Sequence, residues 1–234
     1  MPSAGGGHRD REGAGTVRLW LKFARSAQLA YISHLDTHRA YYRLFRRANL
    51  PLAFSQGFNP HPILSLASPM PLGYRSEADY VDLCLAEPLA MSHLLERLQR
   101  VTLQTEFSFL GARMVKADRK PLAAEVAWTD YEVQVLGQGS LAQAVQAFTG
   151  AEEVHFLKKS KSSTKLVNAK PLVRDVRVED NRLRAVLSSS EPVFFRPDEF
   201  LALLGGLSGE EYQADYVVRK ELYLRAESLM APLD

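Results

Sequence analysis

Apolar and polar residues alternate over several short segments of this chain, and that alternation predicts half-buried β-strands. Residues 16–24 are the clearest case, because Val17, Leu19, Leu21 and Phe23 fall on one face. A short strand from Leu52 precedes a loop rich in glycine and proline. Further strands are predicted over residues 63–67, 78–86, 103–115, 130–136, 154–158, 166–178, 181–187 and 216–225.

Apolar residues at helical spacing predict four helices, over residues 33–47, 88–101, 140–148 and 197–204. The first helix has a Ser33 N-cap and places Asp36 near the positive end of the helix dipole. Gly205 and Gly206 predict the end of the last helix. We expect the helices to cover the first strand with Leu35, Tyr42, Leu94 and Leu98.

The order of these elements is strand, helix, strand, strand, helix, strand, which defines a ferredoxin-like unit, and the pattern then repeats. The sequence therefore predicts an α+β protein with two tandem ferredoxin-like (βαββαβ) lobes, each with an antiparallel sheet. The expected boundaries are a flexible tail over residues 1–15, an N-terminal lobe over 16–117, a linker over 118–129 and a C-terminal lobe over 130–234.

Composition narrows the classes of protein that this chain can belong to. Of its 234 residues, 46% are hydrophobic, which is enough for a sizeable core. No apolar run approaches the roughly 18 residues of a membrane span, and residues 1–15 do not resemble a secretory signal, so we expect a cytoplasmic protein. The single cysteine, Cys84, excludes an intrachain disulfide and a cysteine-based zinc or iron–sulfur site, and a packed thiol is expected there.

The net charge is only +2, but the basic residues are concentrated in two segments. Residues 16–50 hold seven Lys/Arg against one acid, and residues 158–170 hold five lysines and no acid. Such asymmetry suggests a polyanionic partner, most plausibly nucleic acid, although solvated faces with scattered charge would explain it equally well. The residues expected to bind nucleic acid are Arg39, Arg43, Arg46 and Arg47 of the first helix, and Lys158, Lys159, Lys161 and Lys165 of a hairpin loop.

A second group of polar residues surrounds the start of the first helix and the glycine- and proline-rich loop. Such rigid polar loops commonly bind ligands or partners, although a plain hairpin connection would also explain the glycine and prolines. The candidate site residues are Ser33, His34 and Asp36 of the helix and Gln56, Gly57, Phe58, Asn59, Pro60 and His61 of the loop. His34, His38 and His61 leave open a metal site or acid–base pair, but a bare H-x-x-x-H is a weak signal and we expect no metal.

Three stretches carry a family resemblance: residues 31–36, residues 46–51, and residues 55–62 leading into 71–73 and 76–80. Together they resemble the bacterial family known as "radical SAM-linked protein", closely over residues 17–87 and loosely elsewhere. The resemblance implies a radical SAM protein as partner and establishes no activity. The chain lacks the C-x-x-x-C-x-x-C cluster ligands, so it is not itself the radical enzyme.

Three functions are consistent with these observations. The first is a non-catalytic RNA-binding accessory module that acts with a radical SAM partner. The second is an enzyme that uses its histidines for RNA processing or metal chemistry, and the third is a protein-only scaffold for the partner. No P-loop, G-x-G-x-x-G or G-x-S-x-G motif is present, so no cofactor is expected.

Overall fold

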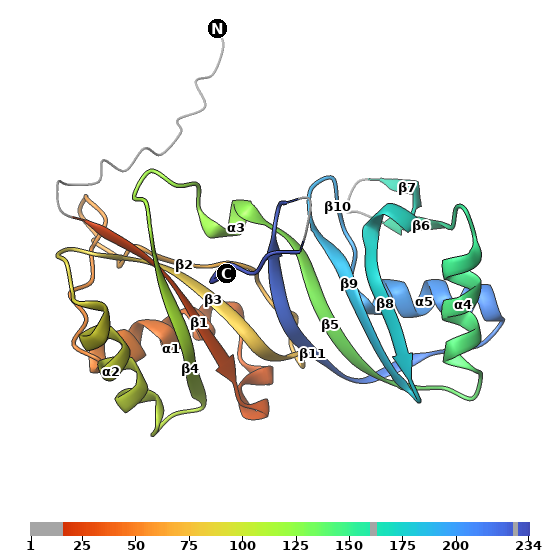
Figure 1. The fold of residues 1–234 in the computed structure, drawn as a ribbon, viewed down its shortest axis with the longest axis horizontal. Coiled ribbons are helices and arrows are strands. Elements are labelled where there is room, and N and C mark those ends of the chain that lie inside the picture. Colours follow the sequence, from red (N-terminus) through yellow and green to blue (C-terminus); the bar gives the residue numbers. More distant parts are fainter. Residues whose placement is uncertain (1–15, 160–162, 227–228) are drawn as a thin grey trace, which may run out of the picture.

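A computed structural model describes residues 16–159, 163–226 and 229–234 (Figure 1). The tail expected over residues 1–15 and Lys161 therefore lie outside the described residues. The first half of the chain forms β1 (Val17–Arg25), η1 (Ala27–Tyr31), α1 (His34–Arg47), β2 (Leu64–Leu66), β3 (Arg75–Leu85), α2 (Met91–Thr102), β4 (Phe107–Val115) and α3 (Leu122–Glu125).

The second half forms β5 (Val126–Leu136), α4 (Leu141–Gly150), β6 (His155–Lys159), β7 (Thr164–Asn168), η2 (Lys170–Leu172), β8 (Val173–Glu179), β9 (Arg182–Ser190), β10 (Val193–Phe194), α5 (Pro197–Ser208) and β11 (Gln213–Leu224). In the residues that the structure describes, no helix has both the length and the apolar character that crossing a membrane requires.

Among the described residues, one mixed sheet of nine strands runs through both halves of the molecule, and the prediction of two tandem ferredoxin-like lobes is wrong. Its order is β10-β9-β5-β11-β3-β1-β4, with β2 beside β3 and β8 beside β9. Figure 1 shows α1 and α2 at one end of this sheet and α4 and α5 at the other. The sheet is not purely antiparallel either, because β11 pairs with β3 in parallel.

The length of β3 explains why the two halves share a sheet. β2 is three residues long and covers Val81–Leu83 of β3, whereas β3 begins at Arg75. The start of β3 would otherwise present unpaired backbone groups at an edge. The last strand, β11, pairs there through Val218 opposite Arg75 and Arg219 opposite Ser76, and also pairs along its length with β5. The final strand therefore joins the two halves.

The predicted face of the first strand is correct, because Leu19, Leu21 and Phe23 are at most 2% exposed and belong to the core beneath α1 and α2. The face of α1 that packs on the sheet is rotated from the one expected, although Tyr42 is partly buried against the same core. Leu35 is 57% exposed, and the buried positions of α1 are Thr37, Tyr41, Leu44 and Phe45. The opposite face of β1 carries Trp20, which packs in a smaller core shared with β11 and α3.

The last helix runs past the glycines that were expected to end it. Gly205 and Gly206 lie inside α5, which continues to Ser208 and ends at Gly209 with a φ of 75°. A Cβ on Gly205 would come within 2.6 Å of the carbonyl oxygen of Glu210, so this position allows close packing of the following turn. Gly209, rather than Gly205, supplies the left-handed residue that terminates a helix.

Candidate functional site

The exposed side of α1 carries the four arginines expected to bind nucleic acid, and all four are exposed. Arg39 forms an ion pair with Asp36 at 3.4 Å, and both side chains are more than half exposed. Ion pairs between such exposed side chains contribute little to the stability of a protein. Arg43, Arg46 and Arg47 have no carboxylate within 4.0 Å in the described part of the chain. Their positive charge is therefore available to an external anion.

A polar groove of about 460 Å³ lies beside the C-terminal end of this helix. Arg46 and Arg97 line it together with one acid, Glu87. Phe54 also lines the groove and is 43% exposed. The guanidinium of Arg97 donates to the carbonyl of Asn49 at 2.8 Å, which fixes it at the groove. The groove therefore combines two cations, an exposed aromatic ring and room for a nucleotide base.

The loop over residues 55–61 is closed by its own hydrogen bonds. Ser55 donates its backbone N–H to the His61 carbonyl at 2.8 Å, and His61 donates its backbone N–H to Ser55 Oγ at 3.1 Å. The Ser55 hydroxyl also contacts His61 Nδ1 at 2.8 Å. Gly57 has a φ of 126°, a conformation that favours glycine. This closure presents Phe58 as a fully exposed ring at the tip of the loop.

The other candidate residues of the loop also face solvent. Gln56, Asn59 and Pro60 are exposed, as is His61 at the base. His61 borders a cavity of about 280 Å³ between the loop and β3, which is also lined by Cys84 and by a buried pair of Arg18 and Asp82. That pair is bidentate, with N–O distances of 2.7 and 2.6 Å. Cys84 is buried, as expected for a packed thiol.

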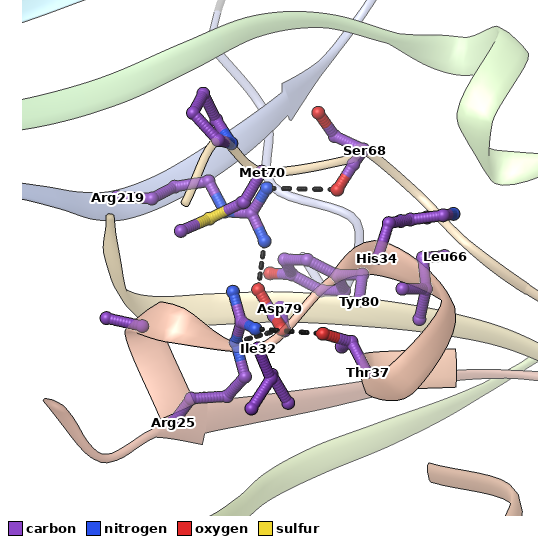
Figure 2. Close-up of a pocket in the computed structure, with 12 residues that line it drawn as sticks. Arg25, Ile32, His34, Thr37, Leu66, Ser68, Met70, Asp79, Tyr80 and Arg219 are labelled. Carbon is purple, nitrogen blue, oxygen red and sulfur yellow. Dashed lines mark hydrogen bonds and ion pairs between the residues drawn. The ribbon is translucent and has the colours of Figure 1, made fainter. Parts of the chain in front are cut away.

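A separate pocket lies at the start of α1, where His34 is found (Figure 2). Its centre is the carboxylate of Asp79 on β3, with Arg25 of β1 on one side and Arg219 of β11 on the other. The Arg25 Nε lies 2.6 Å from Asp79 Oδ2 without hydrogen-bond geometry, so the two groups form an ion pair without a hydrogen bond. Arg219 also donates to the carbonyl of Ser68 at 3.2 Å.

Two hydroxyl groups complete the surroundings of Asp79. Ser76 Oγ donates to Oδ1 at 2.8 Å and Tyr41 Oη donates to Oδ2 at 3.1 Å. Burial, and then the negative charge of Asp79, raise the pKa of Tyr41 well above its usual value. Tyr41 therefore stays protonated and keeps donating at neutral pH. The cluster ties β1, β3, α1 and β11 together below the exposed surface.

The structure does not bring the candidate histidines into one site. His34 and His61 line different pockets that share no residue, and His38 Nε2 contacts the carbonyl of Leu64 at 3.2 Å. Within the described ranges, no three His, Cys, Asp or Glu side chains are grouped so that they could hold a metal ion. Ser33 caps α1 by accepting from the Asp36 N–H at 3.1 Å, as expected.

The hairpin expected around the lysine-rich segment is confirmed as β6 and β7. Lys158 points back to the protein and donates to Glu199 on α5 at 2.7 Å. Its charge is therefore compensated within the chain. Lys159 and Lys165 are exposed, whereas Lys161 lies outside the described residues.

Sequence reasoning missed the buried cluster of Arg25, Asp79 and Arg219. A signal was present, because Asp79 and Asp82 interrupt a strand that is otherwise suited to complete burial. A carboxylate inside such a strand needs a buried cationic partner. The partner of Asp79 could not be predicted from neighbouring residues, because Arg219 lies 140 residues away in the sequence.

The fold and its surface define a mixed α/β protein with an exposed arginine face on α1, formed by Arg43, Arg46 and Arg47, and a buried arginine–carboxylate cluster. The model of the family DUF2344, described as an uncharacterized protein conserved in bacteria, matches residues 18–197, and the chain belongs to this family. No curated protein matches the chain. Among solved structures, a dye-decolorizing protein from V. cholerae is 12% identical over 89% of this chain and 93% of its own, with a TM-score of 0.21, which is too low to support an argument.

Proposed function

We propose that this chain is a non-catalytic RNA-binding accessory module, which binds single-stranded RNA across α1 and the loop over residues 55–61. The observation that carries the proposal is the arginine face of α1, meaning Arg43, Arg46 and Arg47, which have no carboxylate neighbour in the described part of the chain. Guanidinium groups bind phosphate oxygens through paired N–H donors, and a helix holds them at fixed spacing.

Two exposed aromatic residues favour a single strand over a duplex. Phe58 is fully exposed at the tip of its loop, and Phe54 is 43% exposed in the groove beside Arg46. Bases of a single strand can stack on such rings while arginines contact the backbone, an arrangement that binds without reading sequence. The bases of a duplex are already stacked on one another and cannot use these rings.

The proposal is tested by the fluorescence anisotropy of a short labelled single-stranded RNA. The variant R43A/R46A/R47A removes the arginine face, and the matched control R177A/R182A/R225A removes the same charge from exposed positions elsewhere. We expect at least about a tenfold loss of affinity for the first variant and little change for the control. An equal loss in both variants, or no binding by the unaltered chain, would contradict the proposal.

The proposed working partner is a radical SAM protein, and its support is the resemblance of residues 17–87 to the radical SAM-linked family. The chain has one cysteine and therefore depends on a partner for any iron–sulfur chemistry. The test is affinity purification of the tagged chain from its own cells with identification of the bound proteins. A partner with a C-x-x-x-C-x-x-C motif is expected, and its absence from the purified complex would contradict this part of the proposal.

A further inference from the structure

The pocket around Asp79 holds more positive than negative charge. Arg25 and Arg219 are 9% and 2% exposed, and both guanidinium groups contact the same carboxylate. The nearby Lys22 and Glu221 form an ion pair with each other, so they add no net charge to the pocket. The pocket therefore carries one net positive charge in a place with little water, where an uncompensated charge is costly.

The hydrogen-bond donors of the pocket also outnumber its acceptors. The two oxygens of Asp79 already accept hydrogen bonds from Tyr41, Ser76 and Arg219, and Arg25 Nε lies against Oδ2, so little remains of the roughly four acceptor sites of a carboxylate. Arg25 has five N–H donors, yet within the described residues it makes one hydrogen bond, to Thr37 Oγ1 at 3.4 Å. Its buried Nε lies against Asp79 Oδ2 without hydrogen-bond geometry, so the donors of this guanidinium are only partly used within the described residues.

The shape of the pocket limits what this acceptor can be. The enclosed space is about 10 Å³, which is room for a single oxygen-sized atom. The rim includes His34 and Pro71, which are exposed, so a larger group can remain outside while one of its atoms enters. His34 is also the first residue of α1, whose N-terminal end favours negative charge.

We propose that this pocket is an oxyanion site, which takes one oxygen of a phosphate or carboxylate group between Arg25 and the first turn of α1. The bound group supplies both the missing negative charge and the missing acceptor, and His34 contacts the part that stays at the rim. The site shares no residue with the arginine face and does not rest on RNA binding. A water molecule alone would supply an acceptor but no charge.

The test is thermal unfolding of the full chain in increasing sodium phosphate, sodium acetate and sodium chloride at matched ionic strength. We expect the melting temperature to rise and saturate with phosphate or with acetate, and to change much less with chloride, since a ligand that binds only the folded state stabilises it. The more effective of the two salts identifies the source of the oxygen as a phosphate or a carboxylate. Equal shifts in all three salts would overturn the proposal.

Two variants locate the effect. R25Q leaves Arg219 and Asp79 as a balanced pair, and it is expected to abolish the shift that phosphate or acetate produces. H34E tests the same point even if R25Q does not fold, because His34 is exposed and a carboxylate there should weaken oxyanion affinity roughly tenfold or more. H93E, the same substitution at an exposed position of α2, is the control. Unchanged affinity in H34E would overturn the proposal.

Discussion

Replacing Asp79 by asparagine should destabilise the fold more than any exposed charge substitution. The side chain is buried, and its carboxylate is the shared partner of Arg25 and Arg219. Asparagine keeps the volume and one acceptor oxygen, but it removes the negative charge and directs an amide donor at groups that are themselves donors. Both guanidinium groups then remain buried with no counter-charge.

The size of the effect follows from the cost of a buried charge without its partner, which is about 3–5 kcal/mol. In D79N both arginines lose their counter-charge, so we expect the free energy of unfolding to fall by at least about 3 kcal/mol. The whole stability of a natural protein is roughly 5–15 kcal/mol, so D79N should be close to unfolding. The first pairing to weaken is that between β3 and β11, because Arg219 joins these strands.

Urea denaturation followed by circular dichroism measures this loss. With an m-value of roughly 2–3 kcal/mol/M, the midpoint of D79N should fall by about 1–2 M. The control is D36N, which removes an exposed carboxylate paired with Arg39 and should cost less than about 1 kcal/mol. Adding R25Q to D79N should restore part of the stability, since one of the two uncompensated charges is then gone. A D79N midpoint equal to that of D36N would refute this reasoning.

Three further predictions concern single residues. Stability should decline above about pH 10, because the unfolded chain releases the Tyr41 proton there while the folded chain, with its raised tyrosine pKa, retains it; Y41F should show a smaller decline in urea titrations across this pH range, and an identical decline would count against the raised pKa. F58A should weaken RNA binding by about 1–3 kcal/mol in anisotropy titrations without altering the urea midpoint, because the ring is fully exposed; unchanged affinity would exclude stacking at this position. K158A should lower the urea midpoint by breaking a partly buried contact with Glu199, while leaving RNA affinity unchanged; a loss of affinity would show that this lysine contacts RNA despite its pairing.

Local elements of the fold could be predicted because their signals lie within a few residues. Alternation located the first strand and its buried face, and the Ser33 cap located the start of α1. The helical phase of α1 was less well determined. Tyr41 and Tyr42 are adjacent, and tertiary contacts decide which one is buried: Tyr41 packs against Phe23 at 5.1 Å between ring centroids and donates to Asp79.

The single sheet could not be predicted from such local signals. The pairing of β11 with β3 joins residues more than 140 positions apart, and no periodicity of either strand indicates it. The same pairing creates the Asp79 cluster, so the error in topology and the missed pocket have one cause. The exposed residues of the candidate site were easier to predict, because the arginines of α1 and the loop over residues 55–61 depend on local geometry alone.

The salt dependence of RNA binding tests the central claim most directly, since ordinary affinity measurements do not separate phosphate contacts from other contributions. For a single strand, each phosphate contact adds about 0.7 to the magnitude of the slope of log affinity against log salt concentration. If Arg43, Arg46 and Arg47 each contact one phosphate, R43A/R46A/R47A should reduce that magnitude by about 2, and R177A/R182A/R225A should leave it unchanged. A slope that is the same in the unaltered chain and in R43A/R46A/R47A would contradict the account.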